Sequence, residues 1–175
     1  MPARLLHALL KPFLDICLLR LAPQELPASG LLLAVALLAH TITGILISIV
    51  QLNAANAVAA GITDTLLLCA LTFVLLSAHR LGARLTQTLT ALAGSGAIIG
   101  LIALPVTGWF YQAHAGTGSG GLPALILLVL IAWSITVVGH VLRHALSAPF
   151  FLGMIAATAF YGISIWVLNT LFPTG

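Results

Sequence analysis

Residues 55–78 read ANAVAAGITDTLLLCALTFVLLSA, and this segment gives the clearest indication of the fold. It has one charged residue, Asp64, in a run long enough to cross a bilayer, whose core of about 30 Å needs roughly 20 helical residues. Four similar stretches lie at 31–52, 85–111, 122–142 and 150–172. None shows the alternation of a strand, and only a helix satisfies its own backbone polar groups in lipid. The sequence therefore predicts an all-α fold, a polytopic membrane bundle with five transmembrane helices in one domain over residues 31–172.

The composition excludes the soluble classes of protein. Of the 175 residues, 61% are hydrophobic and only 5% are charged, whereas a soluble domain carries about a quarter charged residues. So few charges cannot cover a water-facing surface, and the net charge of +3 is better explained by a membrane than by nucleic acid. We therefore expect membrane lipids as partners and no nucleic acid.

Residues 1–30 form a cytoplasmic or interfacial segment and a linker. Arg4, His7, Lys11 and Asp15 recur every three or four residues among leucines, which predicts an amphipathic helix lying in the membrane interface. Pro12 should break or kink that helix. Cys17 and Cys69 should lie at different depths in the membrane and should not pair with each other. Residues 22–30, which precede the first span, have the composition of a Pro/Gly linker.

The positive residues predict the orientation. All six Lys and Arg residues precede the first span, lie between the second and third spans, or close the fourth span. The positive-inside bias then places the N-terminus in the cytoplasm and the C-terminus outside, as a multi-pass protein of the bacterial inner (plasma) membrane. Trp109, Tyr111, Tyr161 and Trp166 fit anchors at or near the two interfaces.

Two ionisable residues lie inside spans at similar depth. Asp64 is the one acidic residue within a span, and His40 lies near the centre of the preceding, antiparallel span. An ionisable group inside a membrane is a functional candidate, since inserting it costs about 2.5–3.5 kcal/mol. A protonated carboxyl in an interhelical hydrogen bond is the simpler interpretation. A proton or substrate site formed by the two residues is the alternative.

Other motifs point mainly to packing. His140 and His144 share one helix face, and His79 lies at the same end of the bundle. These three are weak candidates for a metal site, because no further ligand is marked by spacing, so we expect neither a metal nor a cofactor. Small residues allow close helix–helix approach in lipid; the candidates for helix packing are Gly44, Gly94, Gly96, Gly100 and Gly153.

The segment RLTQTLTALAG, residues 84–94, resembles a stretch of short bacterial members of the Yip family of integral membrane proteins. That family is named for eukaryotic relatives that bind Rab-type GTPases. The resemblance implies five spans, a cytosolic N-terminus and an external C-terminus. The segment before the first span lacks the long acidic extension of the eukaryotic proteins, so no GTPase-binding role and no binding residues are carried over.

Two functions follow from these patterns. The first is a non-enzymatic scaffold or accessory subunit that packs against larger integral membrane proteins or against itself, which the small-residue faces favour. The second is a small proton- or cation-coupled transporter or permeation unit that uses Asp64 and His40. A polar cavity at the depth of these two residues would favour the second function. No cluster of acid, base and nucleophile marks an enzyme.

Overall fold

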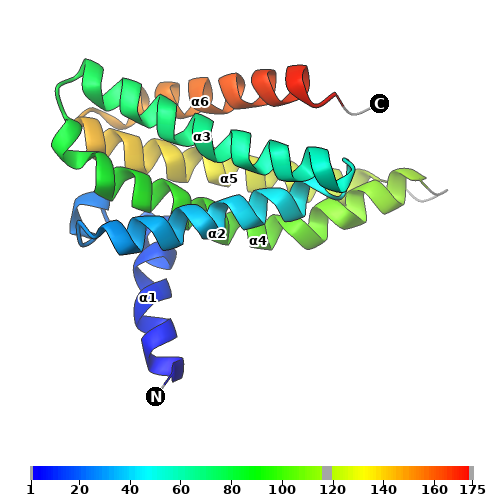
Figure 1. The fold of residues 1–175 in the computed structure, drawn as a ribbon, viewed down its shortest axis with the longest axis horizontal. Coiled ribbons are helices and arrows are strands. Elements are labelled where there is room, and N and C mark those ends of the chain that lie inside the picture. Colours follow the sequence, from blue (N-terminus) through cyan, green and yellow to red (C-terminus); the bar gives the residue numbers. More distant parts are fainter. Residues whose placement is uncertain (1, 116–119, 174–175) are drawn as a thin grey trace.

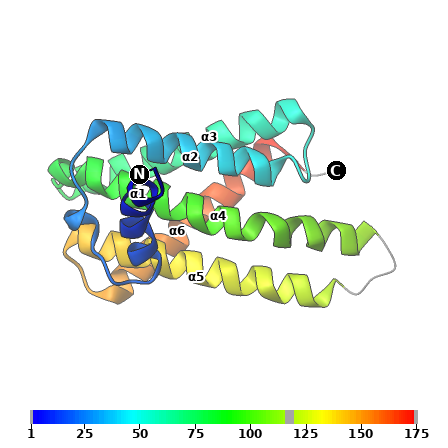
Figure 2. The same cartoon turned by 90° about the horizontal axis from the view of Figure 1, so that it is seen from below.

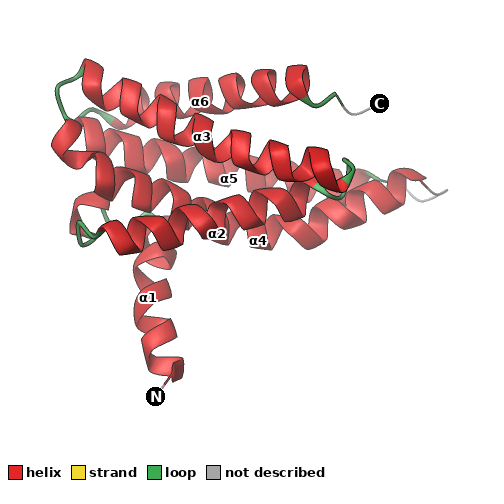
Figure 3. Ribbon diagram, viewed as in Figure 1, coloured by secondary structure: helices red, strands yellow, loops and turns green. Residues whose placement is uncertain are grey.

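The computed structural model describes residues 2–115 and 120–173, and within these ranges it contains helices and no strand (Figure 3). The elements in chain order are α1 (Pro2–Cys17), η1 (Pro23–Glu25), α2 (Gly30–Ser48), α3 (Ala54–Ala78), η2 (Gly82–Arg84), α4 (Leu85–Ala115), α5 (Gly121–Leu146) and α6 (Phe150–Leu171). The five helices α2 to α6 are long and apolar enough to cross a membrane. The predicted all-α membrane bundle is therefore confirmed, and the chain is an integral membrane protein.

The five spans run side by side and antiparallel in chain order, with α4 in the middle (Figures 1 and 2). α4 packs against α2 on one side and α5 on the other, while α3 packs on α2 and α6 packs on α5. Half of the most apolar stretch of α4 is buried, compared with 11% for α2 and for α6. α4 is thus the central helix, and the outer helices turn most of their apolar surface outward.

Several helix ends differ from the predicted bounds. α2 ends at Ser48, whereas α4 continues to Ala115 and α5 continues to Leu146. The glycines at 116, 118, 120 and 121 predict a flexible loop over residues 112–121. Residues 112–115 are helical instead, and 116–119 lie outside the described residues. α5 continues past Arg143 and ends at Leu146, because the backbone of the next residue, Ser147, is left-handed (φ 52°, ψ 39°).

Three helices end in the same way at the end of the bundle that carries the positive residues. Leu19, Arg80 and Ser147 have positive φ angles after α1, α3 and α5. In each case the next amide donates back to a carbonyl five residues earlier, as Ala148 does to Arg143 at 2.9 Å. This is the Schellman termination, which usually has glycine at the left-handed position.

Helix α1 leaves the bundle roughly at right angles to the spans (Figure 1), the direction expected of a helix parallel to the membrane plane. It continues through Pro12 rather than breaking there. Its C-terminal residues Phe13, Ile16 and Cys17 are buried, and Trp133 of α5 donates its indole N–H to the Cys17 carbonyl at 2.9 Å. The end of α1 is therefore part of the core and not only an anchor on its surface.

Candidate functional site: a His–Asp pair in a pocket between the five spans

The tight α2–α3 hairpin brings His40 and Asp64 together. Asn53 begins α3 by accepting a hydrogen bond from the amide of Asn56 at 3.0 Å, which helps to place the two helices antiparallel across a short turn. The helix backbones then approach closely at Gly61, where a Cβ atom would lie 2.8 Å from the backbone nitrogen of Ile45. At this separation, Nε2 of His40 lies 3.1 Å from Oδ2 of Asp64.

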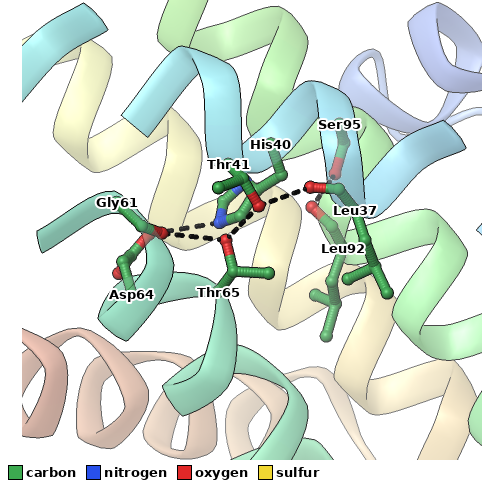
Figure 4. A network of polar contacts seen from close by, with 8 residues as sticks. All are labelled: Leu37, His40, Thr41, Gly61, Asp64, Thr65, Leu92 and Ser95. Carbon is green, nitrogen blue, oxygen red and sulfur yellow. Dashed lines mark hydrogen bonds and ion pairs between the residues drawn. The ribbon is translucent and has the colours of Figure 1, made fainter. Parts of the chain in front are cut away.

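A second polar contact lies beside the pair (Figure 4). The hydroxyl oxygens of Thr41 and Thr65 are 2.8 Å apart, and they also lie within hydrogen-bond distance of the carbonyls of Leu37 and Gly61, respectively. Each hydroxyl has one proton, so one threonine donates to the other while the second donates to its own helix. Two adjacent side-chain contacts therefore set the register between α2 and α3.

The pair lies on the wall of a half-open pocket of about 210 Å³ to which every span contributes. The imidazole of His40 rests on Gly96 of α4, where a Cβ atom would lie 3.0 Å from Nδ1. Because glycine stands there, the ring fits between α4 and Asp64. The other lining residues come from α3 to α6 and are mainly apolar: Leu68, Leu92, Val138, Phe160, Tyr161, Ser164, Ile165 and Leu168.

Neither side chain of the pair is fully buried within the protein, since that of Asp64 is 32% exposed and that of His40 is 16% exposed. Its net charge changes by one unit when it takes up one proton. Ionised Asp64 with neutral His40 carries −1, whereas either singly protonated arrangement, an ion pair or a neutral pair, carries zero. A carboxylate beside an imidazole is an arrangement whose chemistry suits exchange of a proton or binding of a cation.

A second, smaller pocket of about 110 Å³ lies at the end of the bundle away from the positive residues. Leu168 of α6 lines both pockets, so both pockets adjoin this residue. The remaining lining of the smaller pocket includes three polar residues: Ser48, Gln51 and Asn169.

Sequence reasoning missed the contribution of α6. Tyr161, expected near an interface, lines the central pocket together with Ser164 and Leu168. These residues are spaced by three and four positions and so share one helix face. That spacing is a usable signal, but nothing in the sequence indicates which face of an apolar helix turns inward.

The three weak candidates for a metal site, His79, His140 and His144, lie at the end of the bundle that carries the Lys and Arg residues. The rings of His140 and His144 are 4.6 Å apart, and Nε2 of His140 lies 3.2 Å from the Leu21 carbonyl. His79 follows the end of α3. Within 2–115 and 120–173 there is no group of three or more His, Cys, Asp or Glu side chains that could hold a metal ion.

The predicted packing glycines all lie at contacts within the chain. Gly44 faces the backbone of Gly61, Gly94 faces Phe13, and Gly100 faces Thr43. Gly153 faces the backbone of Gly139, and Gly96 faces His40. The small-residue faces are therefore occupied by the chain's own helices.

Comparisons with protein-family models, with curated proteins and with solved structures find no match to this chain.

Proposed function

We propose that this protein is a small proton- or cation-coupled permeation unit, in which the His40–Asp64 pair is the binding site for the transported proton or cation. The observation that carries the proposal is the position of the pair: the one acidic side chain inside a span meets an imidazole on the wall of a pocket that all five spans line. Ionisable residues that face a cavity inside a membrane protein are typical of proton and ion pathways.

The size and lining of the pocket limit the kinds of solute that it can bind. At about 210 Å³ it is smaller than the roughly 300–1,000 Å³ of drug-sized sites. Its wall is largely apolar, so a large polar substrate has few groups to bind. A proton or a small cation fits this wall, and the two would compete because both neutralise the same negative charge.

We infer that the transported proton or cation reaches the site by way of the smaller pocket. That pocket lies between the ends of α2, α3 and α6, and it shares one lining residue, Leu168, with the central pocket. With the predicted orientation in the inner membrane of a bacterium, that route would lead from the outside to the pair.

Flux measurements on reconstituted protein test this proposal. Vesicles with a pH-sensitive dye inside and an imposed potassium-diffusion potential should show proton flux with the parent protein. Asp64→Asn should reduce it by about tenfold or more, because an amide cannot take up a proton while it keeps most of the hydrogen bonding.

The matched control is Thr72→Val, a nearly isosteric change of a buried polar residue on the same helix. Among the described residues, the Thr72 hydroxyl has one hydrogen-bond partner, the Leu68 carbonyl at 2.7 Å. The flux of this variant should equal that of the parent. If the parent carries no proton or cation flux, or if a folded Asp64→Asn protein keeps full flux, the permeation proposal is wrong.

The second candidate is the accessory subunit, and the observation that favours it is α1. The N-terminal part of this helix points away from the bundle (Figure 1). Leu10 and Leu14 of the helix and Leu18, just after its end, are exposed and form a surface suited to lipid or to another membrane protein. Stoichiometric partners retained in mild detergent, together with a parent protein that carries no flux, would favour this role.

A further inference from the structure

Arg143 at the basic end of the bundle has an unusual environment. Its Cβ atom packs near Gly153 of α6, and its guanidinium carbon lies 5.4 Å from the centre of the Phe150 ring. Its Nε atom is buried and has no hydrogen-bond partner among the described residues. Arg143 is thus held by its contacts with Gly153 and the Phe150 ring, while the Nε–H group of its charged guanidinium has no acceptor among the described residues.

Such a group is costly, because a buried polar atom that loses its water must be compensated by a new partner. The acidic side chains do not supply one, since within the described ranges none of them forms an ion pair with Arg143. Glu25 comes from the neighbouring η1, but its Oε1 accepts the backbone N–H of Ala22 at 2.9 Å.

Beside Arg143 lies a pocket of about 270 Å³. Its wall includes Gln24, His144 and Ser147, so it is largely polar, unlike the central pocket. A second arginine, Arg84, lies behind this wall, because its Nη1 donates to the hydroxyl of the lining residue Ser147 at 2.7 Å and to the Ala145 carbonyl at 2.8 Å. The pocket therefore lies near the guanidinium groups of Arg143 and Arg84 and the imidazole of His144, with the carboxylate of Glu25 close enough to act on that imidazole.

These features favour the binding of an anion with several acceptor oxygens. Arginine forms its best-directed hydrogen bonds with phosphate and carboxylate groups, and basic pockets between helix ends are where anionic headgroups bind in membranes. We propose that this pocket binds a phosphate group through Arg143, carried either by an anionic phospholipid headgroup or by phosphate in solution. The proposal is independent of the permeation function.

The test uses the purified full chain in mild detergent, with lipid retention measured by native mass spectrometry and stability measured by thermal unfolding. Phosphatidylglycerol should be retained and should raise the midpoint of unfolding, while phosphatidylcholine should not. Inorganic phosphate, added alone, distinguishes the two sources: a shift with phosphatidylglycerol only identifies the headgroup, and a shift with phosphate identifies an anion from solution.

Arg143→Gln should weaken retention by about tenfold, the effect of one lost charged contact. Arg20→Gln is the matched control, since it removes the same charge from an exposed residue outside the pocket lining, and it should retain lipid like the parent. Equal losses in the two variants would mean that binding follows net charge and would overturn the proposal. If Arg143→Gln does not fold, measurements on the parent protein still test the proposal. Equal retention of phosphatidylglycerol and phosphatidylcholine, with no change of the unfolding midpoint in phosphate, would overturn the proposed phosphate site.

Discussion

At the scale of single residues, the His40–Asp64 pair depends on the absence of a side chain opposite it. Gly96 leaves the space that the imidazole fills, with 3.0 Å between Nδ1 and the position of a Cβ atom. Gly96→Ala should therefore push the ring away from α4 and lower the stability by about 1–3 kcal/mol, the usual cost of overpacking. We expect a lower unfolding midpoint and a lower proton flux.

The matched control for Gly96→Ala is Gly162→Ala. A Cβ atom on Gly162 meets nothing within 4 Å, so alanine should be neutral or should stabilise the helix by about 0.5–1 kcal/mol. Equal losses in the two variants would show that Gly96 does not position the imidazole.

Cys17 provides a test of how deeply α1 is packed. Burial raises the pKa of its thiol from 9.0 to about 11, so the folded protein holds this proton at a pH where the unfolded chain loses it. The stabilising contribution is complete below pH 9.0 and is lost as the pH rises towards 11, because the unfolded state then binds fewer protons. At pH 8, iodoacetamide should not modify Cys17 in folded protein and should modify it in unfolded protein, as peptide mass spectrometry would show. Rapid modification of the folded protein would mean that the end of α1 is not packed in the core.

At the scale of helices, the left-handed termini offer a way to stabilise the bundle. Arg80 is exposed and has φ 59° after α3, a conformation that costs a residue with a Cβ atom roughly 1–2 kcal/mol and costs glycine almost nothing. Arg80→Gly should therefore raise the stability by about 1 kcal/mol. Arg80→Ala removes the same charge but keeps the Cβ atom, so its unfolding midpoint should stay near that of the parent. A midpoint for Arg80→Gly no higher than that for Arg80→Ala would contradict this account of the terminus.

The packing of the helices also explains where the central pocket lies. α2 and α3 are joined by a very short turn and by the close approach at Gly61, so their relative rotation is narrowly set. α6 packs mainly on α5, and it approaches α3 with its Tyr161 and Ser164 side chains at the pocket. The pocket lies where the tight hairpin and the α5–α6 pair meet around α4.

At the scale of the whole molecule, the placement of the positive residues predicts its orientation in the membrane. Ala83 lies in η2 at the basic end, and Ala55 lies near the start of α3 at the opposite end; both are exposed. In intact cells, a membrane-impermeant maleimide should label Ala55→Cys and not Ala83→Cys, in a background with Cys69 replaced by alanine. Both variants should be labelled after the cells are broken. The reverse pattern in intact cells would contradict the N-in orientation.

The features that depend on composition along the chain can be predicted from the amino-acid sequence. Five long apolar stretches predict five membrane helices, because each helix must match the thickness of the bilayer and satisfy its own backbone. The same reading selected Asp64 and His40, because an ionisable residue stands out in an apolar run. It also predicted that α1 is a helix separate from the spans.

Which helix faces pack against one another is known only from the folded chain. The spans are apolar almost all round, so no periodicity in the sequence marks the inward face, and the rotation of each helix about its axis is set by packing against its neighbours. That packing brings Nε2 of His40 to 3.1 Å from Asp64, turns Tyr161 into the pocket and buries Cys17. It also leaves the Nε atom of Arg143 without an acceptor among the described residues, because its surroundings come from helices distant in the sequence, whose contacts no local pattern encodes.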